Sequence, residues 1–199
     1  GTGANVVIPN GGIRMVATDG AGSGAAVTDV LDVLGGTGNV GLGSGAFGTG
    51  LTTGTDNVAI GEDAGDALTS GSDNVFIGDA AGSATTTASN NVGVGSEALA
   101  ANTTGSNNTA VGTAALGANT TAINNVAIGK EALTATTTGG LNVGVGTYAL
   151  AANTTATKNV AVGVSSMQDN TTGQYNTALG YEALHANTTA NYNVGIGFS

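Results

Sequence analysis

Several residue types are scarce or missing in this chain of 199 residues, and each absence narrows the classes of protein it can belong to. There is no Cys, which excludes a disulfide framework and thiolate metal sites and leaves the redox compartment open. Three Lys and Arg stand against 13 Asp and Glu, for a formal charge of −10, so the chain lacks the cations that bind phosphates. No run approaches the roughly 18 apolar residues of a membrane span, and no segment has the pattern of a signal peptide. We therefore expect neither a nucleic-acid partner nor insertion into a membrane.

Large apolar residues are also scarce. Val, Leu, Ile and Phe together number 41, about a fifth of the chain, which is close to the composition of chains that do not bury a core. In their place stand 36 Gly, 31 Thr and 21 Asn, so the chain is polar without being charged. The composition by itself almost predicts disorder.

A short motif of the form N-V-A-I-G recurs along most of the chain, and it changes that interpretation. The first step between copies is 18 residues and the later steps are 17. The motif glycines are Gly43, Gly61, Gly78, Gly95, Gly112, Gly129, Gly146, Gly163, Gly180 and Gly197. The motif asparagines, four residues earlier, are Asn39, Asn57, Asn74, Asn91, Asn108, Asn125, Asn142, Asn159, Asn176 and Asn193. Between them stand a β-branched residue, a small residue (Phe76 is the exception) and a branched aliphatic residue, which predicts a short strand.

The rest of each unit reads G-x-x-A-L-x-x-N-T-T-[GA]-x-x-N, most clearly from residue 91 onward. A 17-residue unit with one short strand is too small for a helical hairpin or a propeller blade, but it suits one coil of a parallel β-solenoid. About ten such coils, stacked at about 4.8 Å, give an all-β rod on the order of 50 Å long. Equal positions then form columns, in which the asparagines pass amide hydrogen bonds between coils and the glycines turn with positive φ or approach a neighbouring coil closely.

The side-chain pattern also makes predictions about the interior. The Val and Ile columns, two residues apart, share one face, and we expect them to build the core. The small column between them indicates a close approach to another backbone. The Ala-Leu pair in the second segment, taken as neighbours on a strand that point opposite ways, predicts further apolar surface. Each coil would thus be apolar on two sides, which favours association of several chains around a symmetry axis.

The strings NVAIGKEALTATTTG, NVGVGSEALAANTTG and NTALGYEALHANTTA resemble the head repeats of trimeric autotransporter adhesins (YadA type). They are still more similar to the repeat shafts of bacteriophage tail fibres. The resemblance covers about residues 39–199, and it implies a left-handed parallel β-roll assembled as a homotrimer. Adhesin-head units are typically shorter than 17 residues, so the N-T-T turn would be an enlarged loop.

Residues 1–38 lie outside the period and are expected to form an irregular N-terminal β region that caps or connects to the shaft of residues 39–199. The runs VVIP, GIRMVAT and AAVTDVLDVL are prone to form strands. Val27, Val30, Leu31 and Leu34 would equally line one face of a helix.

Candidates for catalytic or metal chemistry are few, and we expect neither an enzyme nor a cofactor. His185, the only histidine, stands at a variable column that predicts a surface position. Asp56 with Asp73, and Glu62 with Asp79, occupy equal columns one coil apart. Such pairs favour a solvated acidic band over a site for a hard cation such as calcium. The string GTGNVGLG is followed by no helix and is a weak nucleotide signal.

Pairs of threonine recur in the N-T-T turns and form a candidate rim for surface binding. They are Thr103-Thr104, Thr120-Thr121, Thr137-Thr138, Thr154-Thr155, Thr171-Thr172 and Thr188-Thr189. Regular Thr ranks on solenoids suggest ice binding by analogy, but adjacent residues of a strand cannot both point outward. A turn whose hydroxyls bind backbone groups is the plainer interpretation.

These features favour a structural attachment protein: a trimeric shaft segment of a viral tail fibre or of a bacterial surface adhesin, extracellular and in contact with a host receptor or glycan. One alternative is an ice- or glycan-binding solenoid that uses the Thr/Asn rim. Another is a subunit of an extracellular filament that stacks end to end.

Overall fold

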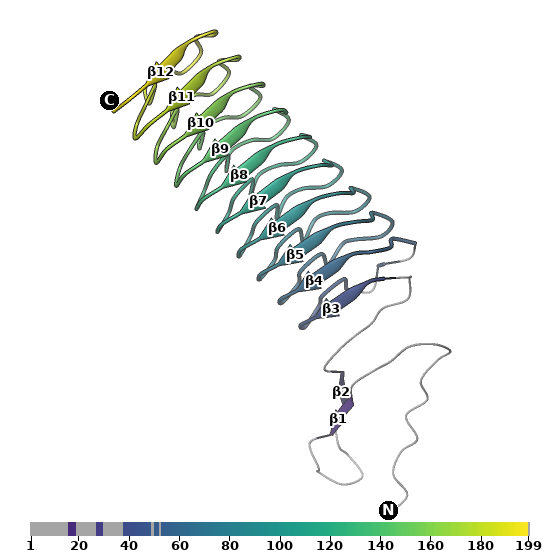
Figure 1. Ribbon diagram of the computed structural model, residues 1–199. Coiled ribbons are helices and arrows are strands. Elements are labelled where there is room, and N and C mark those ends of the chain that lie inside the picture. The colour runs from purple at the N-terminus through teal and green to yellow at the C-terminus, as the bar shows by residue number, and fades with distance from the viewer. Residues whose placement is uncertain (1–15, 19–26, 30–37, 49, 52, 199) are drawn as a thin grey trace, which may run out of the picture.

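The computed structural model describes residues 16–18, 27–29, 38–48, 50–51 and 53–198 (Figure 1). Strands β1 (Val16–Thr18) and β2 (Val27–Asp29) pair antiparallel, which places strands in two of the expected N-terminal runs. The VVIP run, Val30, Leu31 and Leu34 lie outside the described residues. The capping role of this region stays a prediction.

The repeats form a β-solenoid in which ten three-residue strands stack as one parallel sheet in sequence order (Figure 1). The strands are β3 (Val40–Leu42), β4 (Val58–Ile60), β5 (Val75–Ile77), β6 (Val92–Val94), β7 (Thr109–Val111), β8 (Val126–Ile128), β9 (Val143–Val145), β10 (Val160–Val162), β11 (Thr177–Leu179) and β12 (Val194–Ile196). Equal motif positions pair throughout, as Val126 does with Val143 and Ala127 with Gly144. The predicted all-β fold, its 17-residue spacing and its in-register columns are confirmed.

The motif glycine is required for two reasons at once. Gly95 has a φ of +131°, in the region that side chains rarely adopt, and a Cβ added to it would lie 2.7 Å from the carbonyl carbon of Gly112. The next coil therefore occupies the space that any side chain would need. Both reasons given for the glycine column from the sequence are confirmed.

The expectation that Val and Ile build the interior is wrong. In β8 the small residue, Ala127, is fully buried, whereas Val126 is half-buried and Ile128 is 41% exposed. In the other strands too the middle residue is the least exposed of the three, because the chain folds back onto the strand within each coil. A Cβ added to Gly144 would lie 3.2 Å from the carbonyl oxygen of Ala149 and 3.3 Å from Leu133 Cγ. Only a small side chain fits this gap, so the β-branched residues point outward.

The second apolar segment also differs from the expectation, because it is a turn and not a strand. Ala115 and Leu116 are adjacent and both fully buried. Leu116 has a φ of 51°, and this left-handed conformation breaks the alternation of a strand so that both side chains enter the core. Each coil consequently has one outward apolar side rather than two.

Buried asparagines form two ladders along the solenoid. In the predicted ladder, the backbone N–H of Asn108 donates to Asn91 Oδ1 at 3.0 Å, and this contact repeats from coil to coil. The second ladder uses the Asn of N-T-T, where Asn119 Nδ2 donates to Asn102 Oδ1 at 2.8 Å. Its members Asn102, Asn119, Asn153 and Asn170 are fully buried. We did not predict it, although the 17-residue recurrence of N-T-T carries the signal.

Candidate interaction surface

The outward side of the ten-stranded sheet carries exposed apolar side chains. We call it the outer strand face, and it consists of the first and third residues of strands β3 to β12. On its two sides run columns that we call the leading border, the residue just before each motif asparagine, and the trailing border, the residue just after each motif glycine. Because the coils are in register, the face and its borders run the length of the rod.

Exposed large hydrophobic side chains gather on this side of the molecule. Fourteen are exposed among the described residues, and all but Ile123 lie on the outer strand face or its borders. They include Leu179 on the face, Leu141 on the leading border and Val164 on the trailing border. So many exposed apolar side chains on one side of a rod are unusual for a protein that stays alone in water.

Aromatic residues cluster on the borders at the C-terminal coils. On the leading border Tyr175 and Tyr192 stack with ring centroids 5.0 Å apart and an interplanar angle of 11°. On the trailing border Tyr181 and Phe198 stack at 5.4 Å and 9°. All four rings are exposed. The coil repeat thus builds two aromatic ladders, one on each side of the outer strand face.

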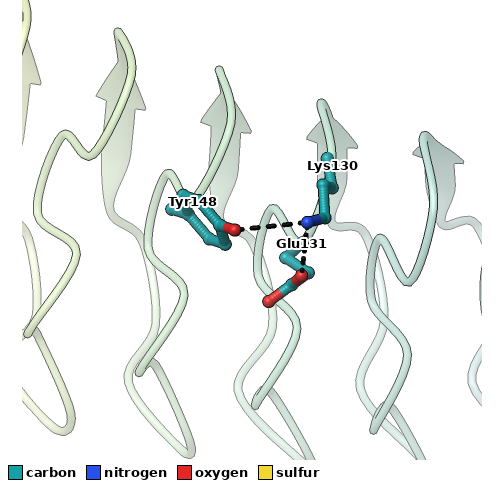
Figure 2. A network of polar contacts seen from close by, with 3 residues as sticks. All are labelled: Lys130, Glu131 and Tyr148. Carbon is teal, nitrogen blue, oxygen red and sulfur yellow. Dashed lines mark hydrogen bonds and ion pairs between the residues drawn. The ribbon is translucent and has the colours of Figure 1, made fainter.

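The two lysines each contact a tyrosine of the following coil. Figure 2 shows Lys130, on the trailing border, whose Nζ donates to Tyr148 Oη at 3.3 Å and lies 3.3 Å from Glu131 Oε1. Lys158, on the leading border, donates to Tyr175 Oη at 3.0 Å and lies 4.8 Å from the ring centroid. The hydrogen bond with Tyr148 and the neighbouring Glu131 raise the pKa of Lys130. The hydrogen bond with Tyr175 raises the pKa of Lys158 in the same direction.

The two threonines of each N-T-T turn play different parts. Thr120 Oγ1 donates to the carbonyl oxygen of Thr137 at 3.1 Å, and the equivalent residues of other coils do the same, as the turn interpretation predicts. Thr121 is exposed, as are Thr104, Thr155 and Thr172. From Thr87 to Thr172 the rim therefore carries a single rank of exposed threonines, one for each coil.

The acidic candidates lie in the two border columns, and Glu62 and Asp79 are exposed on the trailing border. Asp56 and Asp73 lie on the leading border, are exposed and have φ angles of 59° and 58°. His185 Nδ1 lies 3.4 Å from Asp169 Oδ2. Across the described ranges, no group of three or more His, Cys, Asp or Glu side chains is arranged to hold a metal ion. The same ranges contain no helix long and apolar enough to cross a membrane.

Comparison with protein-family models, with curated proteins and with solved structures finds no match to this chain. The function is accordingly inferred from the repeat and its surfaces.

Proposed function

We propose that this chain is the shaft segment of an extracellular attachment fibre, in which several copies, with three favoured, bury the outer strand face against one another. The role is structural and not enzymatic: a rod on a virion or on a bacterial surface that holds a receptor-binding region at a distance. The proposal draws on the resemblance of the repeats to tail-fibre shafts and adhesin heads.

The observation that carries the proposal is the outward direction of the Val and Ile columns. The interior of each coil is already filled by the Ala and Leu columns, which are fully buried in the central coils. The β-branched columns therefore add nothing to that interior, yet an apolar residue occupies them in nearly every coil. A second copy of the chain would bury this stripe, and a closed ring leaves none of it in water.

The remaining surface suits a rod that extends into solution. A formal charge of −10, together with the Thr and Asn of the turns, keeps it hydrated and opposes lateral association with other acidic surfaces. Contact with a host receptor or glycan would then depend on particular places along the shaft or on segments joined to it.

The mass of the protein in solution tests the proposal. Light scattering after size-exclusion chromatography should give about three times the chain mass of 18.8 kDa. The double variant Ile128→Glu/Val145→Glu places charges on the outer strand face and should lower this mass to that of one chain while a β-type circular dichroism spectrum persists. Neither side chain belongs to the buried core.

A matched control is Thr121→Glu/Thr138→Glu, which adds the same charges to the exposed Thr rank of neighbouring coils and should leave the mass unchanged. A wild-type protein that is folded and monomeric at micromolar concentration would rule out the shared face. Equal effects of the two double variants would show that added charge, and not its place, controls association.

The exposed Thr rank supports a second candidate function, the binding of a glycan or of ice along the rim. One hydroxyl for each coil faces solvent at the coil spacing, whereas its neighbour is engaged with a backbone carbonyl. Absence of thermal hysteresis would remove the ice version, and absence of binding on a glycan array, with wild type and Thr121→Val alike, would remove the glycan version.

A further inference from the structure

The two borders carry matching chemistry at six of the nine coils from β4 to β12. From β4 onward the leading border reads Asp56, Asp73, Asn90, Asn107, Asn124, Leu141, Lys158, Tyr175 and Tyr192. The trailing border reads Glu62, Asp79, Ser96, Thr113, Lys130, Thr147, Val164, Tyr181 and Phe198. Both are acidic at β4 and β5, both are small and polar at β6 and β7, and both are aromatic at β11 and β12, whereas they differ at β8, β9 and β10.

Other solvent-accessible columns do not share this trend. The column one residue after the trailing border is acidic with the borders at Asp63, but it also holds Glu97, Glu131 and Glu182 at coils where the borders are polar or aromatic. The exposed Thr rank keeps one residue type from the middle of the shaft to its end. The parallel change is therefore a property of the two borders and not of the rod as a whole.

Contacts within one chain do not account for the match. Each aromatic ladder stacks along its own column, Tyr175 on Tyr192 and Tyr181 on Phe198, and the outer strand face lies between the two columns. The strand that separates the borders is three residues long in every coil and directs its first and third side chains outward. A partner that contacts both sides of the outer strand face would explain why the two borders match.

A second copy of the chain provides that contact. In a closed ring the interface is heterologous, so one side of the apolar face of a chain meets the opposite side of its neighbour's face. A rotation without translation keeps coils at the same height when the rods run parallel to the axis. The leading border of one chain then faces the trailing border of the next at the same coil.

We infer that, in the oligomer proposed above, the two borders meet level by level, so that Tyr175 and Tyr192 of each chain pack against Tyr181 and Phe198 of its neighbour. This inference rests on the proposed function and adds the alignment of coils between neighbouring chains. The aromatic levels hold the C-terminal coils together, because stacked rings bury apolar area in a specific geometry. The acidic levels, Asp56 against Glu62 and Asp73 against Asp79, repel at neutral pH and make the opposite end the weaker one.

Cysteine crosslinking tests the register, since the chain has no native Cys and every thiol is an introduced one. The level pair is Asn107→Cys/Thr113→Cys, both exposed border positions of the β7 coil. The offset pair is Asn107→Cys/Val164→Cys, whose members are three coils, or roughly 14 Å, apart along the rod. Both are treated with a short bis-maleimide and separated under denaturing conditions.

The level pair should give a ladder that ends at covalent trimer, and the offset pair and each single variant should give none. A protein that is trimeric by mass but crosslinks through the offset pair, or through neither pair, would overturn the register and leave the proposed oligomer standing. A monomeric mass would overturn both. If the level pair alters the fold by circular dichroism, Asn124→Cys/Lys130→Cys at the β8 level is the replacement, with the same outcomes.

Discussion

At the scale of single residues, many residues other than glycine adopt the left-handed backbone conformation in each coil. In the unit that follows β7, Gly112, Ala114, Leu116 and Asn124 all have positive φ, at 133°, 54°, 51° and 59°. Side chains in this region cost free energy, about 1–2 kcal/mol for most residues and less for Asn. Hydrogen bonds between coils hold the conformation, as Ala114 N–H does by donating to the carbonyl oxygen of Ser96 at 2.9 Å.

Ala114→Gly should therefore stabilise the protein. Relief of the left-handed strain outweighs the added chain entropy of glycine, and we expect a gain of about 0.5–1 kcal/mol in the free energy of unfolding. Ala118→Gly, the same change in the same coil where φ is not positive, should lose about 0.5–1 kcal/mol. Urea denaturation at one fixed protein concentration measures both, and a gain for Ala118→Gly or a loss for Ala114→Gly would contradict the explanation.

At the scale of one coil, a large side chain on the strand is matched by small residues on the facing turn segment. Phe76 stands in β5 where other strands carry Ala or Gly, and it is fully buried. The facing position, Leu in later coils, is Gly65 in the preceding coil and Gly82 in the coil of Phe76 itself. A Cβ added to Gly82 would lie 2.7 Å from Phe76 Cγ. One ring thus fills the space that two leucines occupy elsewhere, and the early coils are compensated rather than loose.

Phe76→Ala should open a cavity and cost about 3–5 kcal/mol, and Gly82→Leu should overpack the same space and cost roughly 1–3 kcal/mol. The double variant restores one of the two leucines that fill this space in the later coils, so its loss should be smaller than the sum of the two single losses. Denaturation of the four proteins gives the coupling energy between the two positions. Additive losses would show that Phe76 and Gly82 do not share one space.

At the scale of the whole molecule, the solenoid is a stack in which each coil contacts its neighbours through identical columns. The asparagine ladders, the glycine column and the outer strand face all require equal positions to lie above one another. Stability is then close to a sum over coils and the interfaces between them. The number of units can change, whereas equal motif positions of neighbouring units must stay in register.

Removing one whole unit should consequently be tolerated. Deletion of residues 96–112 joins Gly95 to Thr113, keeps every column in register and should leave a folded rod shortened by about 5 Å. Deletion of residues 96–110 removes two residues fewer and shifts the later columns against the earlier ones, so cooperative unfolding should be weakened or lost. Thermal melts followed by circular dichroism compare them. Similar melts for both would refute the requirement for register.

The sequence alone was sufficient for the parallel solenoid, its 17-residue coil and its columns, because a period repeated ten times leaves one way to stack equal positions. The asparagine ladder and the turn glycine followed from the same stacking. Which side of the strand faces inward did not follow. Apolar residues normally point to the core, and nothing in the motif shows how closely the chain folds back on itself.

The tertiary structure decided which side faces inward through the short distance between the strand and the turn that faces it. The turn that carries Ala149 approaches the strand so closely that Gly144 and Ala127 fill the interior and Ile128 is left outside. The leucines of the second segment adopt a left-handed backbone conformation that the local sequence does not predict. This conformation lets them complete the interior, because the side chains of the segment no longer alternate as they would in a strand. Periodicity therefore determined the fold, whereas the space between two backbones decided which residues form the core and which form the outer strand face.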